Sequence, residues 1–174
     1  MRLFIAIEIP KDLKKELIEL QNKLKDVFFG SWVGDKLHLT LKFLGEVDDK
    51  KVKAVKDALN KIKFSRFEIS LKGLGAFPSE EHIRVLWAGV YKGDEEAKDI
   101  QKLVETELEK LGFEKEKREY TNHLTLCRVK SVDKQIVKDV FKKYKNTAFG
   151  TFAVDKISLI KSTLTPKGPI YSPV

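Results

Sequence analysis

The tetrapeptide His38-Leu39-Thr40-Leu41 returns later in the chain as His123-Leu124-Thr125-Leu126. Only three histidines occur among the 174 residues, and two of them open these copies. Residues i and i+2 of an extended strand point to the same face. Each copy therefore predicts a strand that presents one imidazole beside one hydroxyl on one face and two leucines on the other.

The two copies belong to a longer internal duplication, and we call the separation along the chain from His38 to His123 the repeat spacing. The same spacing relates Val47-Asp48 to Val132-Asp133, Phe67 to Phe152 and Leu74 to Leu159. Each of these Asp residues precedes a Lys-rich amphipathic stretch, residues 49–62 and 134–144, and is a typical helix N-cap. Two similar lobes related by an approximate twofold axis would place both His-Thr pairs across one shared groove.

Outside the motifs, apolar periodicity predicts alternating helices and strands. Strands are predicted at residues 2–9, 36–44, 66–74, 83–91 and 151–160, and around His123. Further helices are predicted after Pro10, with an apolar stripe that extends to Val27, and over residues 95–111. Residues 166–169 are expected to form a loop. Half-buried strands with helices on their leucine side indicate an α+β fold.

Strict alternation assigns the residues of the strand at 36–44 to its two faces. Leu37, Leu39, Leu41 and Phe43 are expected to point into the core, and Lys36, His38, Thr40 and Lys42 to the open polar face.

Composition excludes several classes of protein. A single cysteine, Cys127, excludes an internal disulfide framework and a multi-cysteine zinc site. No apolar run is long enough to span a membrane, and the first ten residues lack the form of a signal peptide, so a cytoplasmic protein without a membrane partner is expected. The net charge of +8 suits an anionic partner, although lysines spread along helices more often serve solvation. Abundant lysine with little cysteine or methionine is typical of proteins from hot environments.

Paired histidines indicate acid–base chemistry. Imidazole gains or loses a proton near neutrality, and two positioned imidazoles suit a general acid and a general base acting on one substrate. A lone strand histidine is more often structural, and His82 is not a catalytic candidate because it lies in a predicted loop outside the repeat. Thr40 and Thr125 could donate to an anion, or could simply be β-branched strand formers. Two imidazoles without a third ligand make a poor metal site.

Two of the few arginines, Arg118 and Arg128, flank the second motif. Arginine binds phosphate in a bidentate manner. Strand alternation places Arg128 on the face opposite His123. The Arg128 side chain reaches the groove only if a bulge or a strand end reverses that alternation. In the alternative interpretation, Arg128 faces solvent and pairs with a surface Glu. Cys127 is expected to be a small buried filler rather than a nucleophile. The sequence contains neither a Walker loop nor a dinucleotide fingerprint, so it does not predict bound ATP or NAD.

These motifs resemble the pair that marks the two-histidine phosphoesterase superfamily. More closely, the chain is similar to the RNA 2′,3′-cyclic phosphodiesterase (2′-5′ RNA ligase) family. The resemblance rests on Arg2–Ile7, His38–Gly45, Phe77-Pro78, Arg84–Trp87, His123–Leu126 with Arg128, and Gly168-Pro169 before Tyr171. The family usually has proline before the second histidine, where this chain has Asn122.

The resemblance implies one bilobal α+β domain over residues 1–174, with two pseudo-symmetric lobes whose antiparallel sheets line a V-shaped groove and whose helices lie outside. It implies hydrolysis of the terminal 2′,3′-cyclic phosphate of RNA to a 2′-phosphate, with ATP-independent 2′-5′ joining and no metal or cofactor. The expected partners are RNA ends such as tRNA fragments, bound by a monomer. The implied roles are His38 as proton donor, His123 as proton acceptor, Thr40 and Thr125 as ligands of phosphate oxygens, and Arg128, Arg118, Phe4 and Tyr171 as substrate contacts.

Two alternative functions remain open at this point. The chain could be a phosphodiesterase that acts on small cyclic nucleotides or 2′-5′ oligonucleotides. It could instead be a non-catalytic module that holds RNA ends in a basic groove, although loss of one His-Thr pair would fit that role better.

Overall fold

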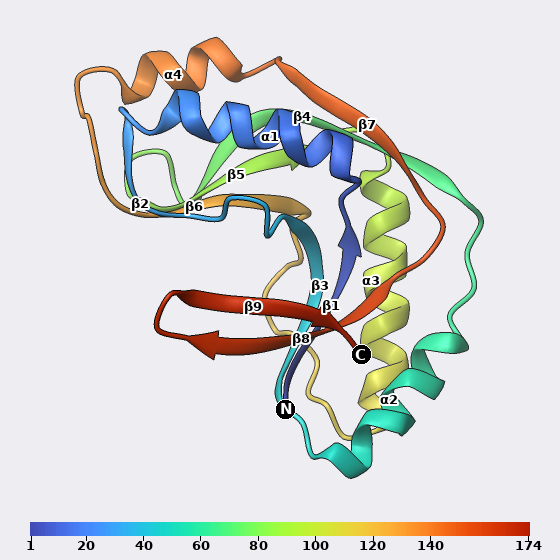
Figure 1. Cartoon of the computed structure of the whole chain (residues 1–174). Helices are drawn as coiled ribbons and strands as arrows, with labels where there is room; N and C mark the ends of the chain where they lie inside the picture. Colours follow the sequence, from blue (N-terminus) through green and yellow to red (C-terminus); the bar gives the residue numbers. More distant parts are fainter.

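The computed structural model describes all residues, Met1–Val174, and shows an α+β fold with four helices and two antiparallel sheets (Figure 1). The first sheet has the order β3-β1-β8-β9, formed by β3 (His38–Glu46), β1 (Arg2–Glu8), β8 (Ser158–Thr165) and β9 (Gly168–Pro173). The second has the order β2-β6-β5-β4-β7, formed by β2 (Phe28–Trp32), β6 (His123–Val132), β5 (Ile83–Val90), β4 (Phe67–Pro78) and β7 (Ala148–Val154). The predicted fold class is therefore confirmed.

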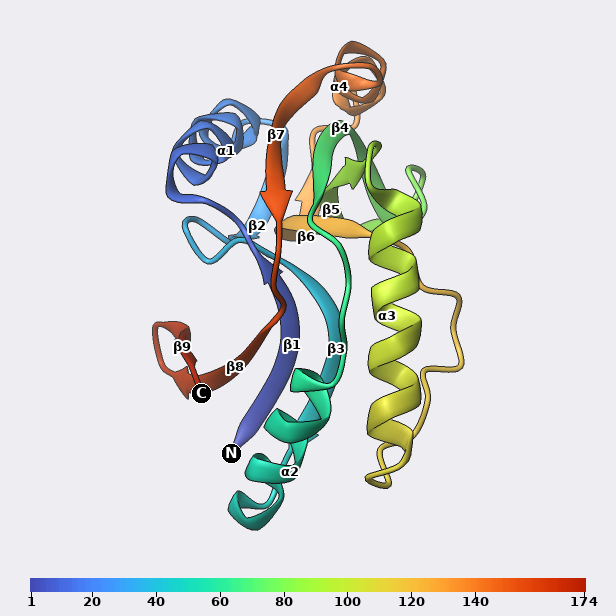
Figure 2. The ribbon, with the colours of Figure 1, turned by 90° about the vertical axis from the view of Figure 1, so that its right-hand side faces the viewer.

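Four helices pack on one side of the sheets and leave β8 and β9 uncovered (Figures 1 and 2): α1 (Lys11–Leu24), α2 (Asp49–Asn60), α3 (Asp94–Glu109) and α4 (Val137–Tyr144). Helix α3 packs along β3, α1 contacts β7, and α4 contacts β4. The apolar stripe of α1 is buried as the spacing of its leucines predicts. No helix is both long and apolar enough to cross a membrane.

The pairing of β4 with β7 follows the internal duplication. Phe67 pairs with Val154, and Ile69 pairs with Phe152. Under the repeat spacing, Phe67 corresponds to Phe152 and Ile69 corresponds to Val154. Exchanging each residue for its counterpart in the repeat turns the Phe67–Val154 pair into the Phe152–Ile69 pair, which is the other observed pair. An approximate twofold axis between the two strands requires this exchange.

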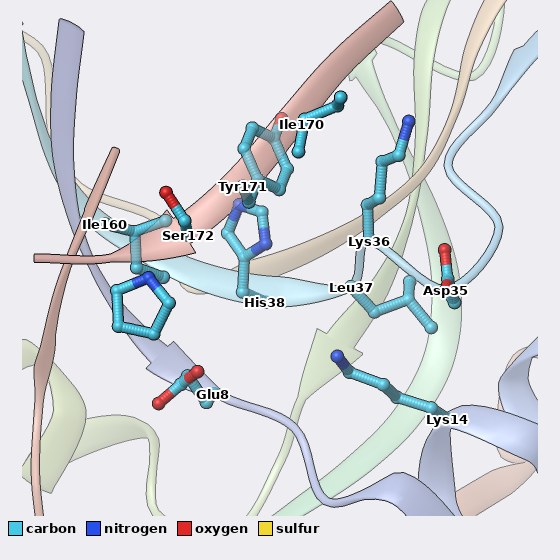
Figure 3. Close-up of a pocket in the computed structure, with 11 residues that line it drawn as sticks. Glu8, Lys14, Asp35, Lys36, Leu37, His38, Ile160, Ile170, Tyr171 and Ser172 are labelled. Atoms are coloured by element: carbon cyan, nitrogen blue, oxygen red, sulfur yellow. The ribbon is translucent and has the colours of Figure 1, made fainter. Parts of the chain in front are cut away.

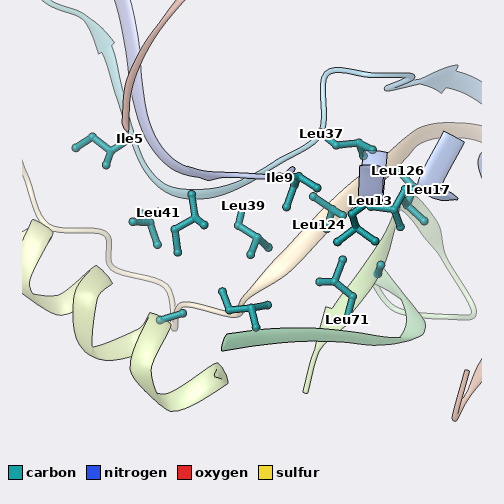
Figure 4. Close-up of a cluster of buried hydrophobic side chains, with 14 of the residues drawn as sticks. Ile5, Ile9, Leu13, Leu17, Leu37, Leu39, Leu41, Leu71, Leu124 and Leu126 are labelled. Carbon is teal, nitrogen blue, oxygen red and sulfur yellow. The ribbon is translucent and has the colours of Figure 1, made fainter. Parts of the chain in front are cut away.

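One hydrophobic core of 37 buried residues joins the two sheets. The leucines of both motif copies lie in it, and Figure 4 shows Leu39 and Leu41 of β3 in the same cluster as Leu124 and Leu126 of β6. Because side chains alternate along a strand, burial of these leucines turns the His and Thr side chains of both motifs to the opposite face.

The two predicted N-caps differ. The Asp48 carboxylate accepts a hydrogen bond from the backbone N–H of Lys50 at 2.9 Å, at the start of α2, as expected. The Asp133 carboxylate accepts from the backbone N–H of Gln135 at 3.0 Å, but α4 begins only at Val137. Asp133 therefore stabilises a turn ahead of the helix, and the predicted helix at 134–144 starts later than expected.

Strict alternation fails in the middle of β3. In its ladder with β1, Thr40 pairs with Ala6 and Lys42 pairs with Ile5, so Leu41 is an extra residue that forms a bulge. Lys42 consequently turns inward and is 9% exposed, whereas Phe43 turns outward and is 68% exposed. The predicted core position of Phe43 was therefore wrong. Lys42, expected on the open polar face, lines the groove but is buried.

The strand predictions need three corrections near the chain's edges and end. The single strand expected at 151–160 is two strands, because the chain leaves the second sheet after Val154 and enters the first at Ser158. The edge strands β2 and β9 were not predicted, since Gly and Pro are poor strand formers at interior positions. Within the loop expected at 166–169, Gly168 and Pro169 already belong to β9.

Candidate active site

Both motif copies open into one groove with a volume of about 850 Å³ between the two sheets. The first motif contributes His38 and Thr40, and the second contributes His123 and Thr125. The further polar and aromatic residues of its wall include Trp32, Lys36, Phe43, Phe77, Glu116, Tyr120, Arg128, Lys167 and Tyr171. The groove therefore holds two imidazoles and two hydroxyls together with cationic side chains.

The His38 ring lies between two aromatic rings. Phe4 stacks on it with ring centroids 4.7 Å apart. Tyr171, which Figure 3 shows beside His38, stands edge-on at 4.9 Å. Phe4 is 3% exposed and does not line the groove, so it supports the His38 ring, contrary to the expected substrate contact. Tyr171 does line the groove.

Burial lowers the pKa of His38 from 6.5 to about 4, and the Lys14 ammonium adds to this effect. The backbone of Lys36 and the charge of Glu8 act in the opposite direction. Figure 3 shows Glu8, Lys14 and Lys36 around a smaller hollow of about 300 Å³ beside His38. His38 is therefore neutral in the free protein at neutral pH, and a bound anion would raise its pKa.

The His123 ring is oriented by a backbone carbonyl. Its Nδ1 lies 2.8 Å from the carbonyl oxygen of Thr121, which assigns the proton of the neutral ring to Nδ1 and leaves Nε2 as the acceptor. Phe77 packs edge-on at 4.8 Å, and Trp87 lies at 6.2 Å. Burial lowers the pKa of His123, and the Thr121 carbonyl partly opposes this. Thr121 corresponds to Lys36 under the repeat spacing, so the backbone at the same place in each repeat raises the pKa of the histidine.

Arg128 lines the groove because β6 contains a bulge. Thr125 pairs with Trp87 and Cys127 pairs with Leu86, which leaves Leu126 as the extra residue. Cys127 is consequently fully buried, and burial raises the pKa of its thiol to about 11, as suits a filler. Burial raises the pKa of the Tyr171 hydroxyl, while the charges of Arg128 and Arg2 lower it. Arg128 of the second sheet and Tyr171 of the first line the same groove.

Two other candidates lie outside the groove. Arg118 is exposed and absent from the wall, contrary to expectation, and its backbone N–H donates to Glu116 at 3.2 Å. His82 is exposed in the turn between β4 and β5. No group of three or more His, Cys, Asp or Glu side chains is arranged to hold a metal ion.

Sequence reasoning missed several groove residues, among them Phe43, Lys167 and Tyr120. Phe43 was missed because strict alternation ignores the bulge. Tyr120 lies in an irregular segment without periodicity, and Lys167 lies in a turn that only the pairing of β8 with β9 brings to the groove. The one signal that could have identified Phe43 is its correspondence with Arg128 under the repeat spacing.

The sequence matches the family described as LigT-like phosphoesterase over residues 7–87 and 90–171. The chain belongs to this family. It is 44% identical over 172 residues to an RNA 2′,3′-cyclic phosphodiesterase of Methanocaldococcus jannaschii, covering 98% of this chain and 96% of the relative. A protein of the same name from Archaeoglobus fulgidus is 37% identical over 172 residues, with the same coverage.

Solved structures of LigT-like proteins share the fold. The protein TT0787 of Thermus thermophilus superposes with a TM-score of 0.80 at 26% identity, covering all of this chain and 95% of that protein. Escherichia coli LigT, in complex with 3′-AMP, superposes with a TM-score of 0.79 at 24% identity, covering 99% of this chain and 94% of LigT.

Proposed function

We propose that this LigT-like phosphoesterase hydrolyses the 2′,3′-cyclic phosphate at the end of an RNA and leaves a 2′-phosphate. The observation that carries the proposal is the convergence of two His-Thr pairs and Arg128 on one groove. The relatives named RNA 2′,3′-cyclic phosphodiesterase support the choice of substrate.

In the proposed reaction, a water molecule attacks phosphorus in line with the bond to the 3′ oxygen. Nε2 of His123 takes a proton from the water as the new P–O bond forms. Protonated His38 gives its proton to the 3′ oxygen as the P–O3′ bond breaks. Both histidines then return to their starting states by exchange with solvent, so no metal or cofactor is required.

The remaining polar groups are proposed to hold the phosphate. Thr40 and Thr125 donate hydroxyl hydrogen bonds to the non-bridging oxygens, and Arg128 offsets the negative charge that redistributes over them. The rings of Tyr171 and Phe43 in the groove wall offer flat surfaces to the nucleoside, because bases stack readily on aromatic side chains.

We further propose that a 5′-hydroxyl of a second RNA can replace the water. Attack by that hydroxyl would form a 2′-5′ bond without ATP, because one P–O bond forms as the P–O3′ bond breaks. The groove volume of about 850 Å³ supports this proposal, since it exceeds the space that a lone water nucleophile needs.

RNA ends such as tRNA fragments are the proposed substrates, acted on by a cytoplasmic monomer. We also infer that residues 1–174 act as one bilobal domain, and the core shared by the two sheets supports this.

The decisive experiment is product analysis on RNA that ends in a 2′,3′-cyclic phosphate, with EDTA present. We expect turnover to persist and the product to carry only a 2′-phosphate. Loss of activity on chelation, restored by zinc or manganese, would refute the metal-free mechanism. Turnover of small cyclic nucleotides alone would favour a different substrate, and tight RNA binding without turnover would favour a binding module.

A further inference from the structure

Three consecutive residues before β6 contact both motifs and α3. The Tyr120 hydroxyl donates a hydrogen bond to the backbone carbonyl of Thr40 at 3.1 Å. The carbonyl of Thr121 lies 2.8 Å from Nδ1 of His123. The Asn122 side-chain amide donates to the Asp94 carboxylate at 2.8 Å and to the Asp94 carbonyl at 3.0 Å. This connector, residues 120–122, therefore joins the first motif, the second motif and the start of α3.

We propose that Tyr120 and Asn122 are positioning residues that hold the two His-Thr pairs in their working arrangement. Tyr120 ties the first motif to the connector, and Asn122 fixes the connector so that the Thr121 carbonyl stays aimed at His123. The proposal rests on the two-histidine reaction proposed above.

The segment that leads to the connector is anchored by a buried ion pair. Nζ of Lys42 lies 2.8 Å from the Glu105 carboxylate and donates to the carbonyl of Glu114, also at 2.8 Å. The backbone N–H of Glu116 donates to the same carboxylate at 3.4 Å. Since Lys42 lies on β3 close to Thr40 and Glu105 lies on α3, the segment is fixed from both sides before it reaches Tyr120.

Hydrogen bonds at Asn122 take the place of a proline ring. Proline at this position, usual in the family that the sequence resembles, restricts the backbone of the preceding residue to extended conformations. Asn122 has no such ring, but it is 4% exposed and its amide is bound twice to Asp94. Asp94 is held in turn by the Lys98 ammonium at 2.9 Å. These contacts restrain Thr121, which carries the carbonyl that selects the His123 tautomer.

The proposal for Asn122 is tested by the nitrogen NMR signals of the histidine rings. The spectra are recorded at a pH high enough for the rings to be neutral. With only three histidines, each set of signals can be assigned by replacing one histidine at a time. We expect His123 to carry its proton on Nδ1 in the wild type and in Asn122→Pro, and to shift partly to the Nε2 tautomer in Asn122→Ala. The exposed Asn60→Ala should match the wild type. A shift in both Asn122 variants, or in neither, would overturn the proposal.

The proposal for Tyr120 is tested by steady-state kinetics on RNA with a 2′,3′-cyclic phosphate end. We expect Tyr120→Phe to lower kcat by about 10-fold with KM changed less than about twofold, because a small displacement of a reacting group is costly while the ring still fills its place. Tyr91→Phe, at an exposed site, should behave as the wild type. Unchanged kcat, or a higher KM alone, would overturn the role of Tyr120. If the wild type has no turnover, the proposed function fails, and the NMR measurement still decides the role of Asn122.

Discussion

Arg128 faces the same groove as His123, although the odd number of steps along β6 from one to the other would place them on opposite faces of a regular strand. The bulge at Leu126 reverses the alternation. The bulge at Leu41 does the same in β3 and turns Phe43 to the groove. Because these two bulges correspond under the repeat spacing, both halves of the duplication use one irregularity to bring a further side chain beside the His-Thr pair.

Replacing Arg128 tests whether its guanidinium holds the phosphate. We expect Arg128→Ala to lower kcat/KM by about 10²-fold, as loss of one donor to a developing oxyanion usually does. Arg128→Lys should recover only part of this loss, because lysine keeps the charge without the planar fork. The exposed Arg66→Ala is the matched control in steady-state assays on cyclic-phosphate RNA. Identical kinetics for Arg128→Ala and the wild type would assign Arg128 to the solvated surface.

Replacing the histidines tests the division of labour between them. His38→Ala and His123→Ala should each slow hydrolysis by about 10² to 10⁴, the usual contribution of one positioned proton-transfer group. The double variant should be far less impaired than the product of the two effects, because the pair acts as a unit. His82→Ala should leave the rate unchanged, since His82 lies in an exposed turn. A comparable loss in His82→Ala would contradict the assignment.

Alternation along the strands was enough to predict that the leucines of both motifs are buried and that His38, Thr40, His123 and Thr125 share the opposite face. It failed at Phe43 because a bulge is a property of the ladder between two strands, which a single strand's sequence does not show. The burial of Lys42 was equally hidden, because its partner Glu105 comes from a helix far along the chain.

The connector shows a different limit of sequence reasoning. Tyr120 and Asn122 lie in an irregular segment, and their partners Thr40 and Asp94 are brought to them only by the tertiary fold. The edge strand β9 was missed for a local reason, since glycine and proline, which occupy half of its positions, are poor strand residues. Periodicity therefore identified the proposed reacting groups, while the residues that position them depend on contacts between distant segments.

Removal of Glu105 tests the buried ion pair with Lys42, whose side chains are 10% and 7% exposed. Glu105→Ala should lower the free energy of unfolding by about 3–5 kcal/mol, because it leaves a buried ammonium without its partner. The exposed pair of Lys53 and Asp57 is the control, and Asp57→Ala should cost less than about 1 kcal/mol. Denaturant unfolding measures both. Equal, small losses would show that Lys42 escapes to water when Glu105 is absent.

The pH dependence of kcat/KM tests the low pKa of His38. This parameter reports the free enzyme, in which the proposed mechanism requires protonated His38 and neutral His123. Burial lowers the pKa of both rings, that of His38 to about 4. The bell-shaped profile should therefore have its maximum on the acid side of the ordinary histidine pKa of 6.5, with limbs that belong to the coupled pair. In kcat, which reports the bound state, the substrate anion raises the pKa of His38, so the alkaline limb should lie at higher pH.

Two single substitutions should shift the pKa of His38, and with it the pH profile, in opposite directions. Lys14→Gln removes a cation that lowers the pKa of His38, so the limb of kcat/KM that His38 sets should move to higher pH. Glu8→Gln removes an anion that raises this pKa, so the same limb should move to lower pH. RNA affinity, governed by phosphate contacts, should instead fall with added salt and change little with pH. Profiles that neither substitution moves would show that His38 sets neither limb and is therefore not the proton donor.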